Sequence, residues 1–280
     1  MEWFEETFHP RWRQRIRMEK VLHRQQSAFQ ELLVFESTDF GRVLALDGVL
    51  QTTERDEYIY HEMICHVPLL AHGAAQHVLI IGGGDGGTLE EVLKHRGVER
   101  ATLVELDPAV IEVSRRWLPE ISRGAFADPR SEIVIADGVR HVRESGRRFD
   151  VVIVDSTDPV GPGEALFGQS FYDDCRRCLR PGGVLVAQTG NTFGEEPALR
   201  DAQRRLRATF SVVDFYLAAL PTYLGGPFTF SFASDDPAKR GTPAAELSAR
   251  GCPPGLRHYS PEVHVAAFAH PAWLNEIAVA

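Results

Sequence analysis

The chain has 280 residues, of which 44% are hydrophobic and 25% charged, the balance of an ordinary globular protein. Its net charge of −9 argues against nucleic acid as a partner and is compatible with a small polycationic substrate. No apolar run approaches the roughly 20 residues that span a bilayer, and the acidic N-terminus lacks the form of a signal peptide. We therefore expect a cytoplasmic protein that binds neither membrane nor nucleic acid.

In the first part of the chain, residues from about Glu19 to Thr53 have the pattern of short β-strands. Two apolar runs, Glu31–Glu36 and Arg42–Leu46, are separated by turn signals. Asp47-Gly48 follows the second run, and Asp-Gly is a strong signal for a tight hairpin. We expect a small N-terminal β-hairpin domain over 1–57.

The remainder, residues 58–280, alternates between helical and apolar strand patterns after a helix over Tyr58–Leu70. Near-continuous apolar strands separated by helices indicate a parallel, doubly wound sheet of the Rossmann type. The predicted strands are His77–Gly82, Ala101–Asp107, Glu132–Asp137, Phe149–Asp155 and Gly183–Gln188, with an antiparallel pair, Val212–Leu220 and Phe228–Ala233, closing the sheet. Helices are predicted over Thr88–Lys94, Pro108–Trp117 and Ser170–Leu179, and a loop with a short helix over Asp235–Pro254. The predicted fold class is α/β, with 58–280 as one Rossmann-like domain.

The four cysteines agree with a reducing compartment. Cys175 and Cys178 form a C-x-x-C, but they lie within a predicted helix and the chain has no second such motif. An ordinary helical pair is favoured over a metal or redox site.

A glycine-rich loop, Gly82-Gly-Gly-Asp-Gly-Gly87, follows the first long strand and opens a helix. Such glycines permit a tight turn and close approach of the backbone to a ligand. Glu105, at the end of the next strand, is placed to accept the two hydroxyl protons of a ribose. By this fingerprint alone a nicotinamide dehydrogenase is possible.

Asp85 lies inside that loop and argues against a dinucleotide, because its carboxylate would repel the pyrophosphate. A nucleoside that has no phosphate and carries a positive charge, such as an adenosyl sulfonium compound, would suit the loop. The alternative is that Asp85 is a helix N-cap. Asp137-Gly138, after the third strand, could accept the exocyclic amine of adenine, or Asp137 could be a cap as well.

The most informative segment is Asp155-Ser-Thr-Asp-Pro-Val-Gly-Pro-Gly163, directly after a strand-like apolar run. Ligands of open α/β sheets bind at the carboxyl ends of strands. A pair of carboxylates there, Asp155 and Asp158, could bind a cationic substrate or move its proton. The alternative is that Asp155 caps a turn and Asp158 is a solvated residue before proline.

The chain resembles the polyamine aminopropyltransferases, most of all the bacterial spermidine synthases. The resemblance runs from about Trp3 to Leu274. Residues 41–63 and 155–163 are highly specific for that family, and 220–226 also matches, whereas 78–87 and 104–107 are shared with methyltransferases. The resemblance implies a methyltransferase-like sheet and transfer of an aminopropyl group from decarboxylated S-adenosylmethionine to putrescine, giving spermidine and methylthioadenosine. It implies no cofactor, no metal, and a homodimer or homotetramer joined through the N-terminal β region.

Site residues are also implied by the resemblance. The donor nucleoside would contact Gln30, Asp85, Glu105, Asp137, Gly138 and Pro162. Asp85 would hold the ammonium of the donor's aminopropyl group. The diamine would contact Tyr60, His61, Asp85, Asp155, Ser156, Thr157, Asp158 and Tyr223, with Asp155 as the proton acceptor. Gln51 and Glu54 could face the site and are left outside this set.

Other functions stay open at this point. Within aminopropyl transfer the acceptor could be cadaverine, agmatine or spermidine, and a methyltransferase is the nearest different enzyme. A dehydrogenase is disfavoured by Asp85. A polyamine-binding module without activity is disfavoured because binding needs charge but not an aligned proton acceptor, as Asp155 would be.

Overall fold

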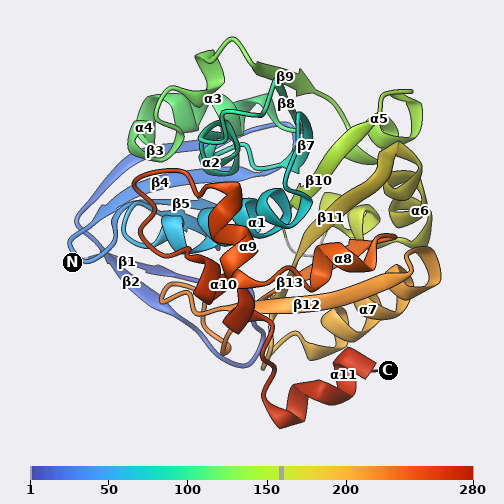
Figure 1. The fold of residues 1–280 in the computed structure, drawn as a ribbon. Coiled ribbons are helices and arrows are strands. Elements are labelled where there is room, and N and C mark those ends of the chain that lie inside the picture. The colour runs from blue at the N-terminus through green and yellow to red at the C-terminus, as the bar shows by residue number, and fades with distance from the viewer. Residues whose placement is uncertain (1, 158–160, 280) are drawn as a thin grey trace.

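The computed structural model describes residues 2–157 and 161–279 (Figure 1). The N-terminal region contains a two-stranded sheet and a four-stranded antiparallel sheet. Their strands are β1 (Glu2–Glu5), β2 (Arg15–Met18), β3 (Lys20–Gln26), β4 (Glu31–Ser37), β5 (Gly41–Leu46) and β6 (Val49–Thr53). Asp47 and Gly48 have φ angles of 48° and 75° between β5 and β6, so the predicted hairpin turn is confirmed. The sequence pattern did not predict β1 and β2.

The second region is built on a seven-stranded sheet of order β12-β13-β11-β10-β7-β8-β9. The five strands from β7 to β11 pair with one another in parallel. β12 and β13 add an antiparallel pair beside β11, as predicted. The bounds are β7 (His77–Gly82), β8 (Arg100–Glu105), β9 (Ser131–Ile135), β10 (Phe149–Asp155), β11 (Leu179–Asn191), β12 (Val212–Ala218) and β13 (Phe228–Ser234).

Helices cover both faces of this sheet. The described α-helices are α1 (Glu57–His72), α2 (Gly87–Leu93), α3 (Pro108–Trp117), α4 (Pro119–Ser122), α5 (Gly138–Glu144), α6 (Gln169–Cys178), α7 (Glu196–Thr209), α8 (Pro237–Arg240), α9 (Ala244–Arg250), α10 (Pro261–Ala267) and α11 (Asn275–Val279). Three short 3₁₀ segments are η1 (Ala125–Ala127), η2 (Gly161–Phe167) and η3 (Ala272–Leu274). One face of the sheet packs on α1, α2 and α9, and the other on α5, α6 and α7. The segment predicted as a loop with one short helix contains two, α8 and α9.

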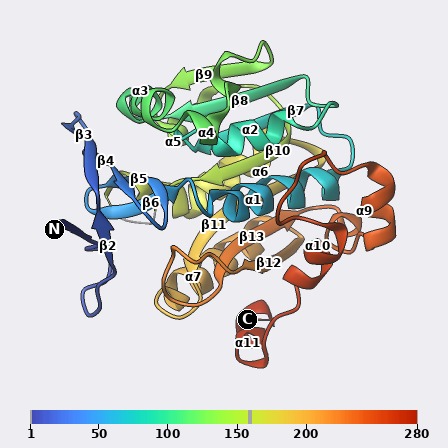
Figure 2. The ribbon, with the colours of Figure 1, turned by 90° about the vertical axis from the view of Figure 1, so that its left-hand side faces the viewer.

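Two apolar contacts fix the N-terminal sheet to the rest of the molecule. Leu32, Val34 and Leu44 pack on α3 and α4, while Leu33 and Phe35, on the opposite face, pack with side chains of β1 and β2. Successive residues of a strand point to opposite faces, so β4 serves both contacts. Figure 2 shows β2–β6 gathered at one side of the molecule and α1 running from them across the larger sheet. The end of β6 and the start of α1 are thereby held close to the carboxyl ends of β7 and β10.

Cys175 and Cys178 lie in α6 and are buried in the core beneath the sheet. Burial raises the pKa of both thiols, which opposes the thiolate form that redox and metal chemistry require. The pair therefore contributes packing.

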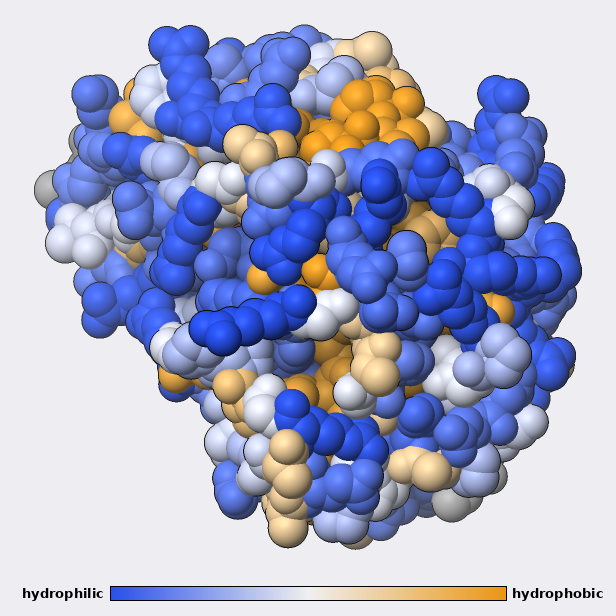
Figure 3. All heavy atoms as spheres, turned by 45° about the horizontal axis from the view of Figure 1, so that its top comes forward, coloured by the Kyte–Doolittle hydropathy of each residue, from blue (hydrophilic) through white to orange (hydrophobic). Residues whose placement is uncertain are grey.

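No helix in the part of the chain that the structure describes is both long and apolar enough to cross a bilayer. The face of the molecule in Figure 3 is largely hydrophilic, with hydrophobic side chains gathered in a few small areas.

Candidate active site

A cavity of about 590 Å³ opens at the carboxyl ends of β7, β8, β9 and β10, where they face the N-terminal sheet. This is the edge at which parallel sheets bind ligands. Eleven of the thirteen residues predicted for the site line the cavity: Gln30, Tyr60, His61, Asp85, Glu105, Asp137, Gly138, Asp155, Ser156, Thr157 and Tyr223. Asp158 lies outside the described residues. Pro162 falls within η2, where only the backbone is described.

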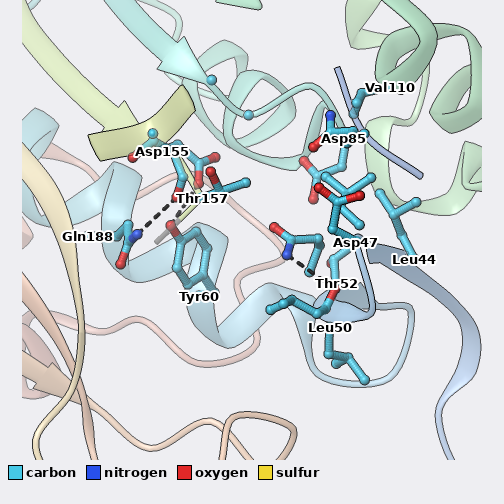
Figure 4. A pocket seen from close by; sticks show the side chains of 18 of the residues that line it. Leu44, Asp47, Leu50, Thr52, Tyr60, Asp85, Val110, Asp155, Thr157 and Gln188 are labelled. Atoms are coloured by element: carbon cyan, nitrogen blue, oxygen red, sulfur yellow. Dashed lines mark hydrogen bonds between the residues drawn. The ribbon is translucent and has the colours of Figure 1, made fainter. Parts of the chain in front are cut away.

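Asp155 ends β10 and lines the cavity. Tyr60 donates its hydroxyl to Oδ1 of Asp155 at 2.7 Å, and Thr88 donates to Oδ2 at 2.5 Å. Figure 4 shows Tyr60 pointing toward Asp155, with Gln188 beside them. Burial and the charge of Asp85 raise the pKa of Asp155, against the opposing effects of His61, Thr88 and Tyr60. Asp155 is thus a stronger base than an ordinary aspartate.

The backbone around Asp155 requires glycine. A Cβ at Gly82 would lie 2.1 Å from the carbonyl oxygen of Asp155, and one at Gly83 would lie 2.8 Å from its Oδ2. Both glycines also have positive φ angles, of 82° and 68°. The glycine-rich loop therefore makes room for the Asp155 carboxylate.

Asp85 has a different environment from Asp155. Its Oδ1 accepts the backbone N–H of Gly87 at 2.9 Å, and its Oδ2 lies 3.3 Å from Nε2 of His61. Burial acts to raise the pKa of Asp85, but His61 and these hydrogen bonds lower it below the ordinary value. Asp85 thus accepts a backbone N–H at the start of α2, but the N-cap residue is Gly86, so the prediction of Asp85 as the N-cap is wrong. Asp85 also presents a negative charge to the cavity.

His61 lies between two carboxylates. Its Nδ1 is 2.7 Å from Oε2 of Glu57, one helical turn earlier in α1, and its Nε2 faces Asp85. Burial alone would lower the pKa of His61, but Asp85 and Glu57 raise it well above the ordinary value. A protonated imidazole carries its positive charge next to the site and has no lone pair for a metal.

Glu105 ends β8 and also lines the cavity. Its Oε1 accepts the backbone N–H of Asp107 at 2.9 Å, and burial raises its pKa to about 7. Gln30 reaches the same corner from the N-terminal region and donates to Oδ2 of Asp107 at 3.1 Å. A Cβ at Gly84 would lie 2.8 Å from Oε2 of Glu105, so this loop passes directly over the carboxylate.

Asp137 follows β9 and caps α5. Its Oδ1 accepts the backbone N–H groups of Val139 at 2.8 Å and Arg140 at 3.2 Å. The capping alternative is correct, and these bonds use one of the two carboxylate oxygens. A Cβ at Gly138 would lie 2.5 Å from the Ile81 side chain, so the backbone at Gly138 packs closely on β7.

Tyr223 and Tyr60 form part of an aromatic wall with Phe228 and Phe230. Tyr223 donates its hydroxyl to the backbone carbonyl of Gln51. The loop that carries it is fixed to the start of α1, because Thr222 donates its backbone N–H to Oδ2 of Asp56 at 2.8 Å. This wall separates the space beside Asp155 from the molecule's apolar core.

Several residues of the site were missed by the sequence reasoning. Gln188 donates to the backbone carbonyl of Ser156 at 2.9 Å and so holds the chain just after Asp155. Glu6 also lines the cavity and accepts the backbone N–H of Leu50 at 3.0 Å, and burial, with the nearby charge of Glu195, raises its pKa. The other missed residues are Glu57 and Thr88. Glu57 stands beside His61 in the specific segment 41–63, which was the available signal; Glu6 lies just after β1, a strand that the pattern did not indicate.

One group of described residues, His61, Asp85 and Asp155, has potential metal ligands within 4.8 Å of one another. The raised pKa of His61 opposes metal binding, since a metal would have to displace its proton. The two carboxylates of this group, Asp85 and Asp155, are suited to organic cations because both line the cavity.

Comparisons with known proteins agree with this geometry. The family model for the spermine/spermidine synthase domain matches residues 57–241, and the model for the spermidine synthase tetramerisation domain matches residues 2–54. Polyamine aminopropyltransferases from Salmonella schwarzengrund strain CVM19633 and Escherichia coli O1:K1 are each 50% identical to the chain over 273 residues. That is 97% of this chain, and 96% and 95% of those proteins.

Two solved structures of similar fold are spermidine synthases. One, in complex with the transition-state analogue AdoDATO, superposes with a TM-score of 0.93 at 43% identity, covering 99% of this chain and 94% of that one. The Thermotoga maritima enzyme superposes with a TM-score of 0.90 at 41% identity, covering 99% and 93%.

Proposed function

Because the chain belongs to the spermine/spermidine synthase family of aminopropyltransferases, we propose that it transfers the aminopropyl group of decarboxylated S-adenosylmethionine to putrescine, giving spermidine and 5′-methylthioadenosine. The observation that carries this proposal is the pair Asp85 and Asp155. They lie in one cavity with pKa values shifted in opposite directions. When their environments lower the pKa of one acid and raise the pKa of another, the first is suited to hold a negative charge and the second to accept a proton.

Asp155 acts on the acceptor. An alkylammonium has a pKa near that of lysine, about 10.4, so it has no free lone pair at neutral pH. Asp155, with its raised pKa, accepts the proton, and burial of the amine beside Tyr60 lowers the amine's own pKa. The freed nitrogen attacks the aminopropyl carbon next to sulfur, the C–S bond breaks, and sulfur keeps the electron pair as a neutral thioether. The sulfonium is already a good leaving group, so the proposed reaction needs neither metal nor cofactor.

Asp85 selects the donor. In decarboxylated S-adenosylmethionine the end of the aminopropyl chain is an ammonium, which the ionised Asp85 attracts. Ordinary S-adenosylmethionine carries a carboxylate at that end, which Asp85 repels. This is specificity by repulsion as well as attraction, and it disfavours a methyltransferase.

The nucleoside of the donor lies between Gln30, Glu105 and Asp137 in this proposal. Glu105 accepts from the ribose hydroxyls and Asp137 from the adenine amine, through the oxygen that its capping bonds do not use. The diamine lies along Tyr60, His61, Asp155, Ser156, Thr157 and Tyr223, with Asp158 after them in the chain. Glu6, which also lines the cavity, is a candidate partner for the second ammonium of the diamine.

We also propose a homotetramer, or a homodimer, joined through the N-terminal strands, because residues 2–54 match a tetramerisation domain. A cytoplasmic location agrees with the four free cysteines.

The test is product identity. Protein incubated with decarboxylated S-adenosylmethionine and putrescine should release methylthioadenosine and spermidine in equal amounts, detected by mass spectrometry. Ordinary S-adenosylmethionine should give neither product nor a methylated amine. Methyl transfer, or binding of polyamine without any release of methylthioadenosine, would overturn the proposal.

A further inference from the structure

Glu57 and His61 form a buried chain of contacts that ends at Asp85. Glu57 is 9% exposed and His61 3% exposed, and they stand one turn apart on α1. The two ring nitrogens of His61 each face a carboxylate oxygen, at 2.7 Å on the Glu57 side and 3.3 Å on the Asp85 side. The reaction described above uses Asp85 and Asp155 but assigns no task to Glu57.

The geometry specifies the protonation of the ring. A neutral imidazole has one N–H and one lone pair, so one of the two carboxylates would face a lone pair inside a buried site. An imidazolium has an N–H on each nitrogen and satisfies both carboxylates. The raised pKa of His61 agrees with this assignment.

The ring is also held in place from its flat side. A Cβ at Gly87 would lie 2.2 Å from Cε1 of His61, so the ring packs against the first turn of α2 where only glycine fits. The same Gly87 donates its N–H to Oδ1 of Asp85. The two oxygens of Asp85 thus have separate partners, the backbone at Gly87 and the ring of His61.

We propose that Glu57 is a positioning residue: it holds His61 as a doubly protonated cation, and His61 in turn fixes the Asp85 carboxylate for the ammonium group of the donor. The inference rests on the proposed function only in naming the donor ammonium as the group that Asp85 receives. Other ionisable groups face His61 as well, Tyr60 from α1 and Asp155 from β10, and the His61 charge lowers the pKa of Asp155. The chain therefore also keeps the proton acceptor available at neutral pH.

The decisive variant is Glu57→Gln, which keeps the size of the side chain and removes its charge. Its matched control is Glu196→Gln, because Glu196 also lies in the first turn of a helix and pairs with a cation four residues on, Arg200, outside the cavity. An acid in the first turn of a helix stabilises the helix through its dipole. If Glu57 had only this structural role, both variants should lose the same modest amount of stability.

The first readout is the protonation of His61 in the unliganded protein, measured by nitrogen NMR with labelled histidine and assigned with His61→Gln. The ring should carry two N–H groups in the wild type at pH 7. In Glu57→Gln its pKa should fall by about 1 to 2 pH units, and in Glu196→Gln it should not move. A neutral His61 in the folded wild type, or equal His61 pKa values in the wild type and Glu57→Gln, would overturn the proposal.

The second readout is ligand binding. Glu57→Gln should weaken binding of decarboxylated S-adenosylmethionine at least about tenfold and leave binding of methylthioadenosine, which lacks the ammonium, unchanged. Equal weakening of both ligands, or the same loss in Glu196→Gln, would reduce Glu57 to a structural acid. Should Glu57→Gln not fold, Glu57→Asp keeps the charge, and the wild-type spectrum still decides the protonation state. Failure of the proposed function would be a different result, because the wild type would then release no methylthioadenosine. The protonation state of His61 could still be measured by NMR in that case.

Discussion

The two ends of the cavity are built in different ways. At the end where we propose that the nucleoside binds, each acid ends or directly follows a strand and accepts a backbone N–H from its own next few residues, as Glu105 does from Asp107 and Asp137 from Val139. At the amine end, Asp155 is held by Tyr60 and Thr88, which lie 95 and 67 residues away in the sequence. The nucleoside end is therefore local structure that many sheets of this type can form, whereas the amine end exists only in the complete fold.

This difference implies that chemistry and binding can be separated by mutation. The largest expected effect is at Asp155. Asp155→Asn should lower kcat about 10²- to 10⁴-fold, because the variant cannot accept a proton, while binding of methylthioadenosine is retained. Single-turnover kinetics and a binding titration on the same preparation measure the two quantities. Turnover close to that of the wild type would remove Asp155 from the role of base.

The second largest effect is expected when the acceptor amine is changed and the protein is not. One methylene is worth about 1–3 kcal/mol, so cadaverine should react about 10- to 200-fold less efficiently than putrescine. Butylamine lacks the distal ammonium and would leave the largely buried carboxyl group of Glu6 without a cationic partner. Its kcat/KM should therefore be lower than that of cadaverine. Steady-state kinetics with the three amines gives the order. Equal values for butylamine and putrescine would contradict a distal ammonium site, and a preference for spermidine would show that the cavity is open at its far end.

The third effect is expected at Asp85, where charge and capping can be told apart. Asp85→Asn keeps an oxygen for the Gly87 N–H, so α2 keeps its support. Loss of the charge should weaken decarboxylated S-adenosylmethionine about 10- to 100-fold, since hydrogen bonds to charged groups contribute about 1.5–3 kcal/mol. Methylthioadenosine should bind as before in calorimetry. If both ligands weakened equally, Asp85 would only shape the loop.

The same difference explains what the sequence could predict. The central strands of the large sheet, such as β7 and β10, are buried on both faces and read as apolar runs, so their positions follow from the sequence. β1 is four residues long and three of them are exposed, which leaves no such pattern. In the site, Asp85 and Glu105 could be found from their spacing to glycines and strand ends. Tyr223 entered only through the family resemblance, and Thr88 and Glu57 were missed, because their roles depend on partners that are distant in sequence or on a neighbour's charge.

Substitution of Glu105 should have the smallest effect on activity. Its main effect should be on the stability of the protein and on how that stability depends on pH. Burial raises its pKa to about 7 in the folded protein, above the ordinary value of 4.5, so the folded state binds this proton more tightly than the unfolded state does. Stability from Glu105 is therefore fully present below about pH 4.5 and is lost as the pH rises through about 7. At pH 8 the ionised side chain costs on the order of 3 kcal/mol, which Glu105→Gln should recover.

Urea unfolding of the unliganded wild type and Glu105→Gln at pH 5 and pH 8 tests this cost. The variant should gain stability over the wild type at pH 8 and little at pH 5, and it should bind methylthioadenosine more weakly because an amide replaces a carboxylate that accepts from the ribose. An equal difference at both pH values would mean that the carboxylate is not strained by burial. A gain confined to high pH would show that the nucleoside end keeps a destabilising charge that only the ligand's hydroxyl groups satisfy. The amine end differs, since Asp85 already has its counter-charge from His61 before any ligand arrives.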